Sequence, residues 1–510
     1  MELQFEHETY ISYDPVLDVE LRQEETLETI VPDACPDILS IAEVRGQAVM
    51  TDKRPGQDFV QVSGTVRATI LYRPEGGGCL CRMNAAVPFL CKEDASGVND
   101  RSRVRACVRL CRAEARLLNP RKILLRVQLN IHLMAATPTE HTNLLPQPKN
   151  QEEAHVCVRQ QQVDHCYCCQ MLEKPFTFED QIRLKSGQSG EPSVLSAVIR
   201  SVESESKIIG RKLIFKGSAD LVLLTQEGNG QLNVSHETLP FSQVMELPEP
   251  ERENCESDVC ITVQEFRWDS DPDDSTVLTV HIDFLAQAAV RCSDQLTLLR
   301  DLYSTAYQSD CQWEVQKLCG GVRENLVPQT VRELLETAEP VHNILDSQVS
   351  LGELSQQDGD TSVTFSVDAF FSALYLDEND NVCRIEHTFP LNCQIDTSPE
   401  LSDHCAGARA SELYVSPAVG GLELRFNVEF CDEVSRLQSV SAITAVQLGE
   451  SRGQSDKPRP SVVLRMVAPG EQLWDIAKAY GTTCEDISEA NGLEQDQPPE
   501  GTLLLVPAAT

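Results

Sequence analysis

The sequence predicts a mainly β protein of three tandem antiparallel β domains, each sandwich-like or barrel-like, followed by a small β-α-α-β domain. One pattern of strands and turns recurs about every 150 residues along the 510-residue chain, and this period is the size of a whole domain. After a segment rich in Gly, Ser and Pro, two short helical periods appear near the C-terminus. We therefore expect β domains at 1–150, 151–300 and 301–445, a linker at 446–460 and the last domain at 461–510.

Each repeat begins with an apolar pair followed by a small or acidic residue. A strand, a polar turn, a second strand and an apolar-Pro-apolar tripeptide follow, and the turn residues are those of hairpin loops. The pairs start at Ile38, Val194 and Ile344, and the prolines, 50, 46 and 46 residues later, are Pro88, Pro240 and Pro390. This agreement at three places indicates one unit used three times.

A second hairpin follows each proline. Its strands are separated by the turns Asn119-Pro120, Ser270-Asp271-Pro272-Asp273 and Gly420-Gly421. Turns of this composition join neighbouring antiparallel strands. Many strands with short turns and few helical periods predict an all-β domain.

Two stretches of the repeats resemble a known family. They are 27–38, with the sequence LETIVPDACPDI, and 301–305, with the sequence DLYST, leading to Tyr307. Both are similar to the SPOCS domain of spore coat assembly proteins in endospore-forming Firmicutes. The resemblance covers about residues 1–445, with the third copy the most diverged at its start. It implies a role in sporulation and attaches no chemistry to the motifs.

The C-terminal segment has the element order of a small mixed domain. A strand is predicted at 462–468, a first helix ends at Gly481, Thr482 or Thr483 caps a second helix that ends at Asn491-Gly492, and a strand returns at 503–506. The apolar faces of the two helices hold Leu473, Trp474, Ile476, Ala477, Ile487 and Ala490. This order closely resembles a LysM domain.

The resemblance implies a shallow groove between two loops, where LysM domains bind N-acetylglucosamine chains of peptidoglycan or chitin. Gln472 replaces the usual small hydroxyl residue, and 497–499 replace the usual apolar lead-in to the last strand. Leu473, Trp474 and Ile476 are expected in the core, so that only loop positions contact a ligand. Carried onto this sequence, the groove consists of Pro469, Gly470, Glu471, Gln472, Leu473, Asn491, Gly492 and Leu493.

Two functions compete for this domain. The first ten residues carry acids where an export signal needs basic residues, so the chain is expected in the cytoplasm, away from mature wall glycan. SPOCS proteins with a C-terminal LysM domain imply a non-enzymatic spore envelope scaffold of clostridia. Such a scaffold docks through its LysM domain onto the ATP-hydrolysing morphogenetic protein of the coat basement layer, at the forespore surface in the mother cell. The alternative is a peptidoglycan-binding protein of the cell wall or cortex.

Several other function classes are not expected. The net charge of −36 disfavours nucleic acid, which would be repelled at long range. No apolar run reaches the ~18 residues of a membrane span. Signature motifs of metalloproteases, serine hydrolases and phosphate-binding loops are missing from the sequence, so neither enzymatic activity nor a cofactor is predicted.

The 20 cysteines show no paired spacing and are expected as reduced, partly buried thiols. The tightest group is His165, Cys166, Cys168 and Cys169. It has no second ligand pair at zinc-site spacing, and no metal is predicted.

An arginine-rich stretch at 101–126 makes residues 1–150 nearly neutral. Arg101, Arg103 and Arg105 alternate, which places them on one face of a strand. Two interpretations stay open: a solvated face, or a docking surface for an acidic partner.

Overall fold

A computed structural model describes residues 2–184, 192–248, 254–271, 274, 276–396, 404–452, 461–493 and 500–507. The first unit contains β1 (His7–Ile30), β2 (Ile38–Pro55), β3 (Phe59–Pro74), β4 (Cys81–Asp94), β5 (Arg103–Asn119) and β6 (Lys122–Leu144). The second contains β7 (Val156–Arg183), β8 (Ser193–Ile209), β9 (Lys212–Gln226), β10 (Leu232–Glu246), β11 (Cys255–Ser270) and β12 (Val277–Ser304). The third contains β13 (Tyr307–Glu336), β14 (Val341–Leu351), β15 (Ser355–Asp358), β16 (Ser362–Asp377), β17 (Val382–Asp396), β18 (His404–Ala418) and β19 (Gly421–Ser451).

The same antiparallel strand order occurs in all three units. In the first, β1-β6-β5 form one sheet and β2-β3-β4 the other; in the second, β7-β12-β11 and β8-β9-β10 repeat this order. The third unit has β13-β19-β18 and a sheet in which β14 and β15 pair along β16, which also pairs with β17. Alternating strand residues from both sheets fill the core between them, as expected for a sandwich. The predicted mainly β fold is confirmed.

The strand register explains the repeated prolines. Pro88, Pro240 and Pro390 lie on the edge strands β4, β10 and β17, opposite Thr65, Ser218 and Asp368. An edge strand tolerates proline because the missing N–H costs no ladder hydrogen bond. The residue after the proline is Phe opposite Gly in the first two units, in the pairs Phe89 with Gly64 and Phe241 with Gly217, and Leu391 opposite Val367 in the third.

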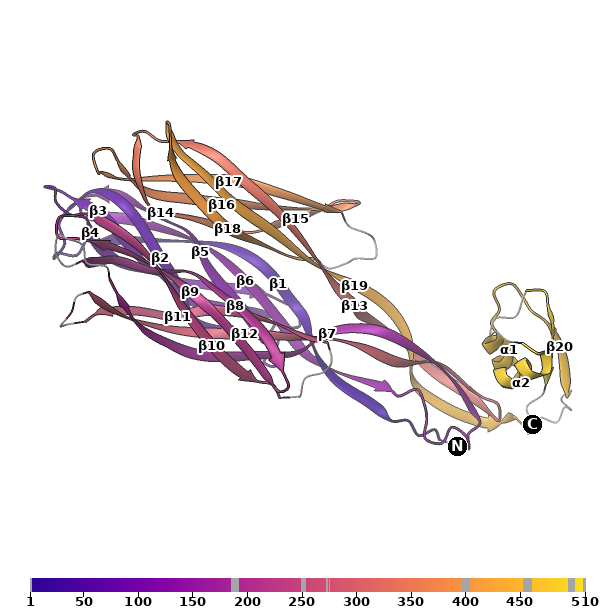
Figure 1. Cartoon of the computed structure of the whole chain (residues 1–510). Helices are drawn as coiled ribbons and strands as arrows, with labels where there is room; N and C mark the ends of the chain where they lie inside the picture. The colour runs from indigo at the N-terminus through magenta and orange to yellow at the C-terminus, as the bar shows by residue number, and fades with distance from the viewer. Residues whose placement is uncertain are drawn as a thin grey trace.

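The three units pack against one another along their length (Figure 1). Leucines from the central strands β3, β9 and β16 meet in one small apolar cluster, which includes Leu71, Leu224 and Leu374. A second cluster joins the long strands near the N-terminus and contains Leu144, Val156, Leu302 and Ile443 among others. The β units therefore form one elongated body.

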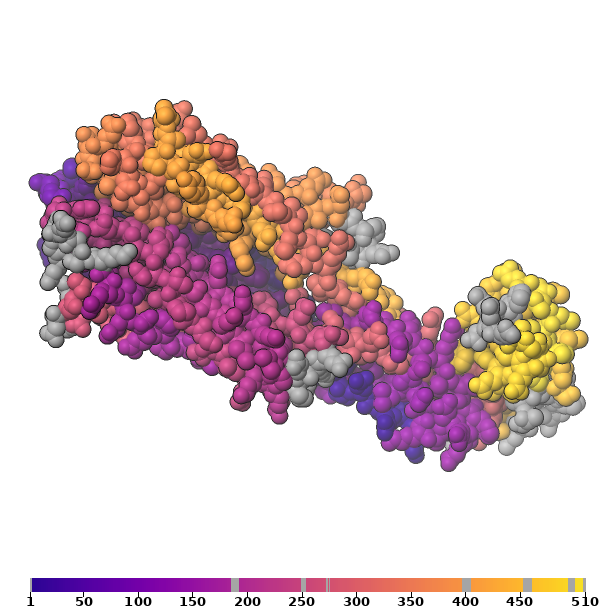
Figure 2. All heavy atoms as spheres, in the orientation of Figure 1, coloured from indigo at the N-terminus to yellow at the C-terminus, as the bar shows by residue number. Residues whose placement is uncertain are grey.

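The C-terminal module contains β20 (Val462–Met466), α1 (Leu473–Tyr480), α2 (Cys484–Asn491) and β21 (Leu503–Pro507). This is the predicted β-α-α-β order. The module forms a lobe at the end of the body where the long strands β7, β12, β13 and β19 have one of their ends (Figures 1 and 2). Ala490, expected on the buried face of α2, is exposed.

Two expected boundaries fall inside strands. Residues 446–451, assigned to the linker from their composition, belong to β19 and pair with β13. The boundary between 300 and 301 lies within β12. The remainder of the expected linker, apart from Arg452, lies outside the described residues. Among the described residues, no helix has the length and apolar character needed to cross a bilayer.

One pair of cysteines departs from the expected reduced state. Cys255 and Cys292 face each other on β11 and β12 and form a disulfide. No spacing between cysteines in the sequence indicates this bridge, because strand pairing rather than local spacing brings the two residues together. Of the group singled out in the sequence, His165 stacks on Tyr167, whereas Cys169 lies beside the disulfide.

Candidate functional site

The C-terminal module is held together by a small core. Its helices contribute Leu473, Ile476, Ala477 and Ile487, and β21 contributes Leu504 and Val506, all of them buried. A capping box between Gln472 and Asp475 begins α1, and one between Thr483 and Asp486 begins α2. Gly481 and Gly492 end the helices in the left-handed conformation that favours glycine.

In the first predicted groove loop, Pro469 and Gly470 are exposed. The Glu471 carboxylate accepts hydrogen bonds from Arg465 Nη2 at 2.9 Å and from the backbone N–H of Ala468 at 3.0 Å. Hydrogen bonding to Ala468 and then to Arg465 lowers the pKa of Glu471. The backbone N–H of Gln472 donates a hydrogen bond to the Asp475 carboxylate at 3.3 Å. Leu473, one of the eight expected groove residues, is a core residue.

The second loop is equally occupied by contacts within the module. Asn491 Nδ2 donates to the carbonyl oxygens of Ile487 and Leu505, both at 2.7 Å, and Asn491 Oδ1 accepts from the backbone N–H of Leu505 at 2.7 Å. Gly492 is exposed, and Leu493 packs against the core that also holds Leu473. The side chains of Glu471 and Asn491 thus stabilise the module, and their polar atoms are already engaged in hydrogen bonds.

The outer face of the β20–β21 sheet is apolar and open. We call Val462, Leu464, Met466, Leu503 and Leu505 the outer sheet face. Alternation places these side chains on the side opposite the core, and Leu464 pairs across the strands with Leu505. They are 41% to 62% exposed. Clustered exposed apolar side chains mark interaction surfaces. This face was not predicted from the sequence, because both strands are apolar on both faces apart from Arg465, and such a run does not show which side is left uncovered.

The module also contacts the β body through α1. The Asp301 carboxylate, near the end of β12, accepts a hydrogen bond from Trp474 Nε1 at 2.7 Å and one from Lys478 Nζ at 2.6 Å. The Trp474 ring meets Tyr303 edge to face, with the ring centroids 4.8 Å apart. Tyr303 is fully buried, and its hydroxyl donates to the carbonyl oxygen of Thr482 at 2.9 Å.

These contacts correct the sequence interpretation in two places. Trp474, expected within the core of the module, is partly buried and is one of its contacts with the body. The 301–305 stretch, which carries the SPOCS resemblance without any chemistry attached, contains Asp301 and Tyr303 and so forms the docking point for the module.

The three β units enclose a cavity of about 1910 Å³, lined by residues from all of them. Two arginines of the 101–126 stretch reach across it: Arg105 pairs with Asp258 of the second unit at 2.5 Å, and Arg112 with Glu386 of the third at 2.9 Å. Arg105 and Arg112 therefore pair with acidic residues of this same chain, in the second and third units.

Buried charged side chains also join the edge strands β2, β8 and β14, one from each of the three units. Arg45 of β2 and Arg200 of β8 both pair with Asp346 of β14, at 2.7 and 2.8 Å. Arg45 and Asp346 are almost fully buried. A buried carboxylate held between two guanidinium groups fixes geometry as well as charge, so this cluster orients the three units relative to one another.

Two segments of the chain match known protein families. Residues 37–117 match the family model described as SipL, SPOCS domain, and 466–507 match the LysM domain. The chain carries a SPOCS domain and a LysM domain. Comparisons with curated proteins and with solved structures found no match.

The SPOCS match covers β2 to β5 of the first unit. That the second and third units are further SPOCS copies is supported by their strand order and remains a prediction. The LysM match covers nearly all of the C-terminal module. Together the two domains fit a sporulation-related protein with a module of a peptidoglycan-binding family, and both are binding domains without known catalytic chemistry.

Proposed function

We propose that this protein is a non-enzymatic scaffold of spore coat or envelope assembly, and that its LysM domain docks onto the ATP-hydrolysing morphogenetic protein of the coat basement layer. The proposal places the chain in the mother-cell cytoplasm, at the forespore surface. The observation that carries it is the outer sheet face, a row of five exposed apolar side chains on a module of about 50 residues. An apolar face of this kind suits a protein partner better than a sugar chain.

The predicted groove supports the same conclusion, because it is poorly suited to bind a sugar chain. Sugar recognition needs polar groups that are ready to hydrogen-bond hydroxyl and acetamido groups. Glu471 and Asn491 are instead engaged within the module. In this LysM domain the candidate glycan groove is therefore poorly supplied with side-chain donors and acceptors.

Charge indicates which kind of protein surface would fit. Residues 461–510 contain eight acidic and two basic side chains. An acidic module that presents an apolar patch is complementary to an apolar surface with a basic rim, because opposite potentials favour encounter and register. We expect such a surface on the basement-layer protein.

The LysM family match itself favours a second candidate, peptidoglycan binding. The exposed backbone of Pro469, Gly470 and Gly492 would then contact the glycan. The two functions differ in what they require: a glycan binder needs the loops, whereas the adaptor needs the outer sheet face.

The test compares the two ligands on the full chain. Purified protein is titrated with the basement-layer protein and, separately, with purified peptidoglycan fragments, and binding is followed by calorimetry. The proposal predicts saturable binding to the protein and no saturable binding to the fragments. Saturable binding to peptidoglycan fragments, with none to the basement-layer protein, would overturn it in favour of the wall-binding function.

A further inference from the structure

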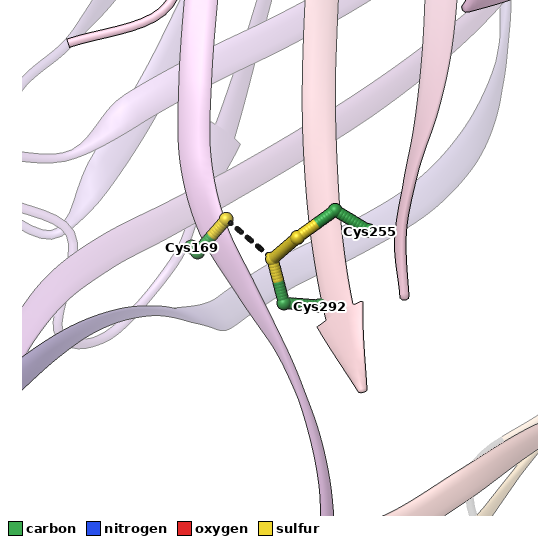
Figure 3. Close-up of side chains that lie close together, drawn as sticks. All are labelled: Cys169, Cys255 and Cys292. Carbon is green, nitrogen blue, oxygen red and sulfur yellow. Dashed lines mark hydrogen bonds between the residues drawn. A yellow bond between two sulfur atoms is a disulfide. The ribbon is translucent and has the colours of Figure 1, made fainter. Parts of the chain in front are cut away.

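Three sulfur atoms gather on the sheet β7-β12-β11 of the second unit (Figure 3). Cys292 of the central strand β12 is bonded to Cys255 of β11. On the other side, Cys169 of β7 lies with its Sγ 3.2 Å from the Sγ of Cys292. All three sulfur atoms lie within 4.8 Å of one another. Cys292 thus has a sulfur neighbour on each adjacent strand.

A β-bulge brings Cys169 to this position. Gln170 pairs with Val290 and Cys168 with Arg291, so that Cys169 is the extra residue of β7 at a register shift. A bulge commonly redirects the extra residue's side chain out of the regular alternation. Here Cys169 Sγ donates a hydrogen bond to the Val290 carbonyl oxygen at 3.4 Å, which holds it near Cys292.

The three cysteines differ in their access to solvent. Cys292 is 1% exposed, whereas Cys169 and Cys255 are each half-buried. A reagent from solution can therefore reach the two outer sulfur atoms far more readily than the central one. The central sulfur of Cys292 is thus protected from solvent, whereas its two possible disulfide partners, Cys169 and Cys255, are accessible.

We propose that Cys169, Cys255 and Cys292 form an internal thiol–disulfide exchange site, in which Cys292 bridges alternately to β11 and to β7. The thiolate of Cys169 attacks the sulfur of Cys292, and the Cys169–Cys292 bond forms while the Cys292–Cys255 bond breaks. Cys255 leaves with the electron pair and takes up a proton from solvent, equivalent to the proton that Cys169 released. The exchange has no net oxidation or reduction, so it requires no external oxidant.

The exchange changes which edge of the sheet is covalently tied. With the bridge to Cys255, β12 is joined to β11, whose Asp258 pairs with Arg105 across the cavity. With the bridge to Cys169, β12 is joined to β7, which packs against β13 of the third unit. Each state leaves one half-buried sulfur as a thiol. That thiol can form a mixed disulfide with a small thiol or with a cysteine of another protein.

Three thiolates could instead hold a soft metal ion such as Cu(I) or Zn²⁺. The structure favours exchange, because the Cys255–Cys292 bond leaves Cys169 as the one of the three that can become a thiolate. Metal binding requires all three sulfur atoms to be reduced together, and the test below distinguishes the two.

The first experiment is an alkylation map of the unreduced full chain. The protein is treated with iodoacetamide at pH 8, quenched in acid, digested and analysed by mass spectrometry. Exchange predicts label on both Cys169 and Cys255, never on the same molecule, with Cys292 unlabelled. A static bridge would give no label on Cys255 and would overturn the proposal. Protection of all three sulfur atoms that is lost on adding a chelator would overturn it in favour of a metal site.

The second experiment removes each partner in turn. In a glutathione redox buffer, Cys255→Ser should form the Cys169–Cys292 disulfide, and Cys169→Ser should keep Cys255–Cys292. Cys168→Ser, which removes the neighbouring thiol, should map like the wild type. Circular dichroism confirms that each variant is folded. If folded Cys255→Ser leaves Cys292 unbridged while Cys169→Ser forms its bridge fully, the two alternatives are not equivalent and the proposal fails.

Discussion

Trp474 of the LysM domain donates its indole N–H to the Asp301 carboxylate at 2.7 Å, across the boundary between the C-terminal module and the β body. Lys478, one turn later on α1, donates to the other carboxylate oxygen at 2.6 Å. One acidic side chain near the end of β12 thereby fixes both the position and the orientation of the module. The outer sheet face is presented from a set position rather than from a free tether.

Replacing Asp301 with Ala should release the module from the body. Hydrogen bonds to a charged group contribute about 1.5 to 3 kcal/mol each, so the docked population should fall substantially. Cys157 reports this change because it packs against the core of the module, where burial raises the pKa of its thiol. The alkylation rate of Cys157 should rise about tenfold or more, measured by mass spectrometry.

Two variants serve as controls for this release. Trp474→Phe keeps the aromatic packing on Tyr303 and loses one hydrogen bond, so it should have a smaller effect. Asp294→Ala changes an exposed acid on the same strand and should have none. An unchanged Cys157 rate in Asp301→Ala would show that these hydrogen bonds do not hold the module in place.

The sequence could predict features set by local chemistry. Hairpin turns and the prolines of edge strands revealed the repeat, and capping residues located both helices of the LysM domain. Features set by strand pairing or unit packing could not be read in this way. Arg105 and Asp258 are far apart in the chain, and nothing near either residue specifies the other. Similarly, Trp474 has the spacing of a core residue, and only the packing of α1 on β12 turns it toward Asp301.

Stability should depend on pH through His132 and Asp18, which pair at 2.7 Å beside the cavity. The hydrogen bond to Asp18 raises the pKa of His132 above its ordinary value of 6.5. Burial is the largest single influence on Asp18 and raises its pKa, but the hydrogen bond and charge of His132, together with Cys405 and Arg105, outweigh burial and lower that pKa. The folded state therefore binds the histidine proton more tightly than the unfolded state, and this contribution is full below about pH 6.5 and is lost as pH rises through the folded pKa.

His132→Gln should consequently flatten the decline of melting temperature above about pH 6.5. Thermal melts of wild type and variant from pH 5.5 to pH 8.5 measure this decline. His342→Gln, which changes an exposed histidine, should reproduce the wild-type profile. If His132→Gln has the same slope as the wild type, the pair does not contribute to the pH dependence.

Gly217→Ala should destabilise the second unit. A Cβ at this position would lie 1.9 Å from the Glu203 carbonyl oxygen of β8 and 2.9 Å from the Phe241 ring. Overpacking of this kind costs about 1 to 3 kcal/mol, because backbone on one side and a large side chain on the other must move. Urea unfolding measures the loss.

Gly407→Ala is the matched control for Gly217→Ala. It is also a glycine within a strand, and a Cβ there meets nothing within 4 Å. Its stability should equal that of the wild type or exceed it slightly, since alanine reduces the entropy of the unfolded chain. Equal losses in the two variants would contradict the packing argument.

The most direct test of the account is the affinity of the full chain for the coat basement-layer protein when the outer sheet face is made polar. Leu464→Thr combined with Leu505→Thr removes an exposed cross-strand apolar pair, leaves the charge unchanged and places β-branched residues, which suit strands, at both positions. Leu90→Thr, at a similarly exposed leucine of the first unit, is the control. We predict that the double variant stays folded and binds at least about tenfold more weakly, while the control binds like the wild type. Fully burying a leucine side chain contributes about 1.5 to 3 kcal/mol, and a tenfold change in affinity corresponds to about 1.4 kcal/mol. Wild-type affinity in the folded double variant would contradict the claim that this face is the docking surface.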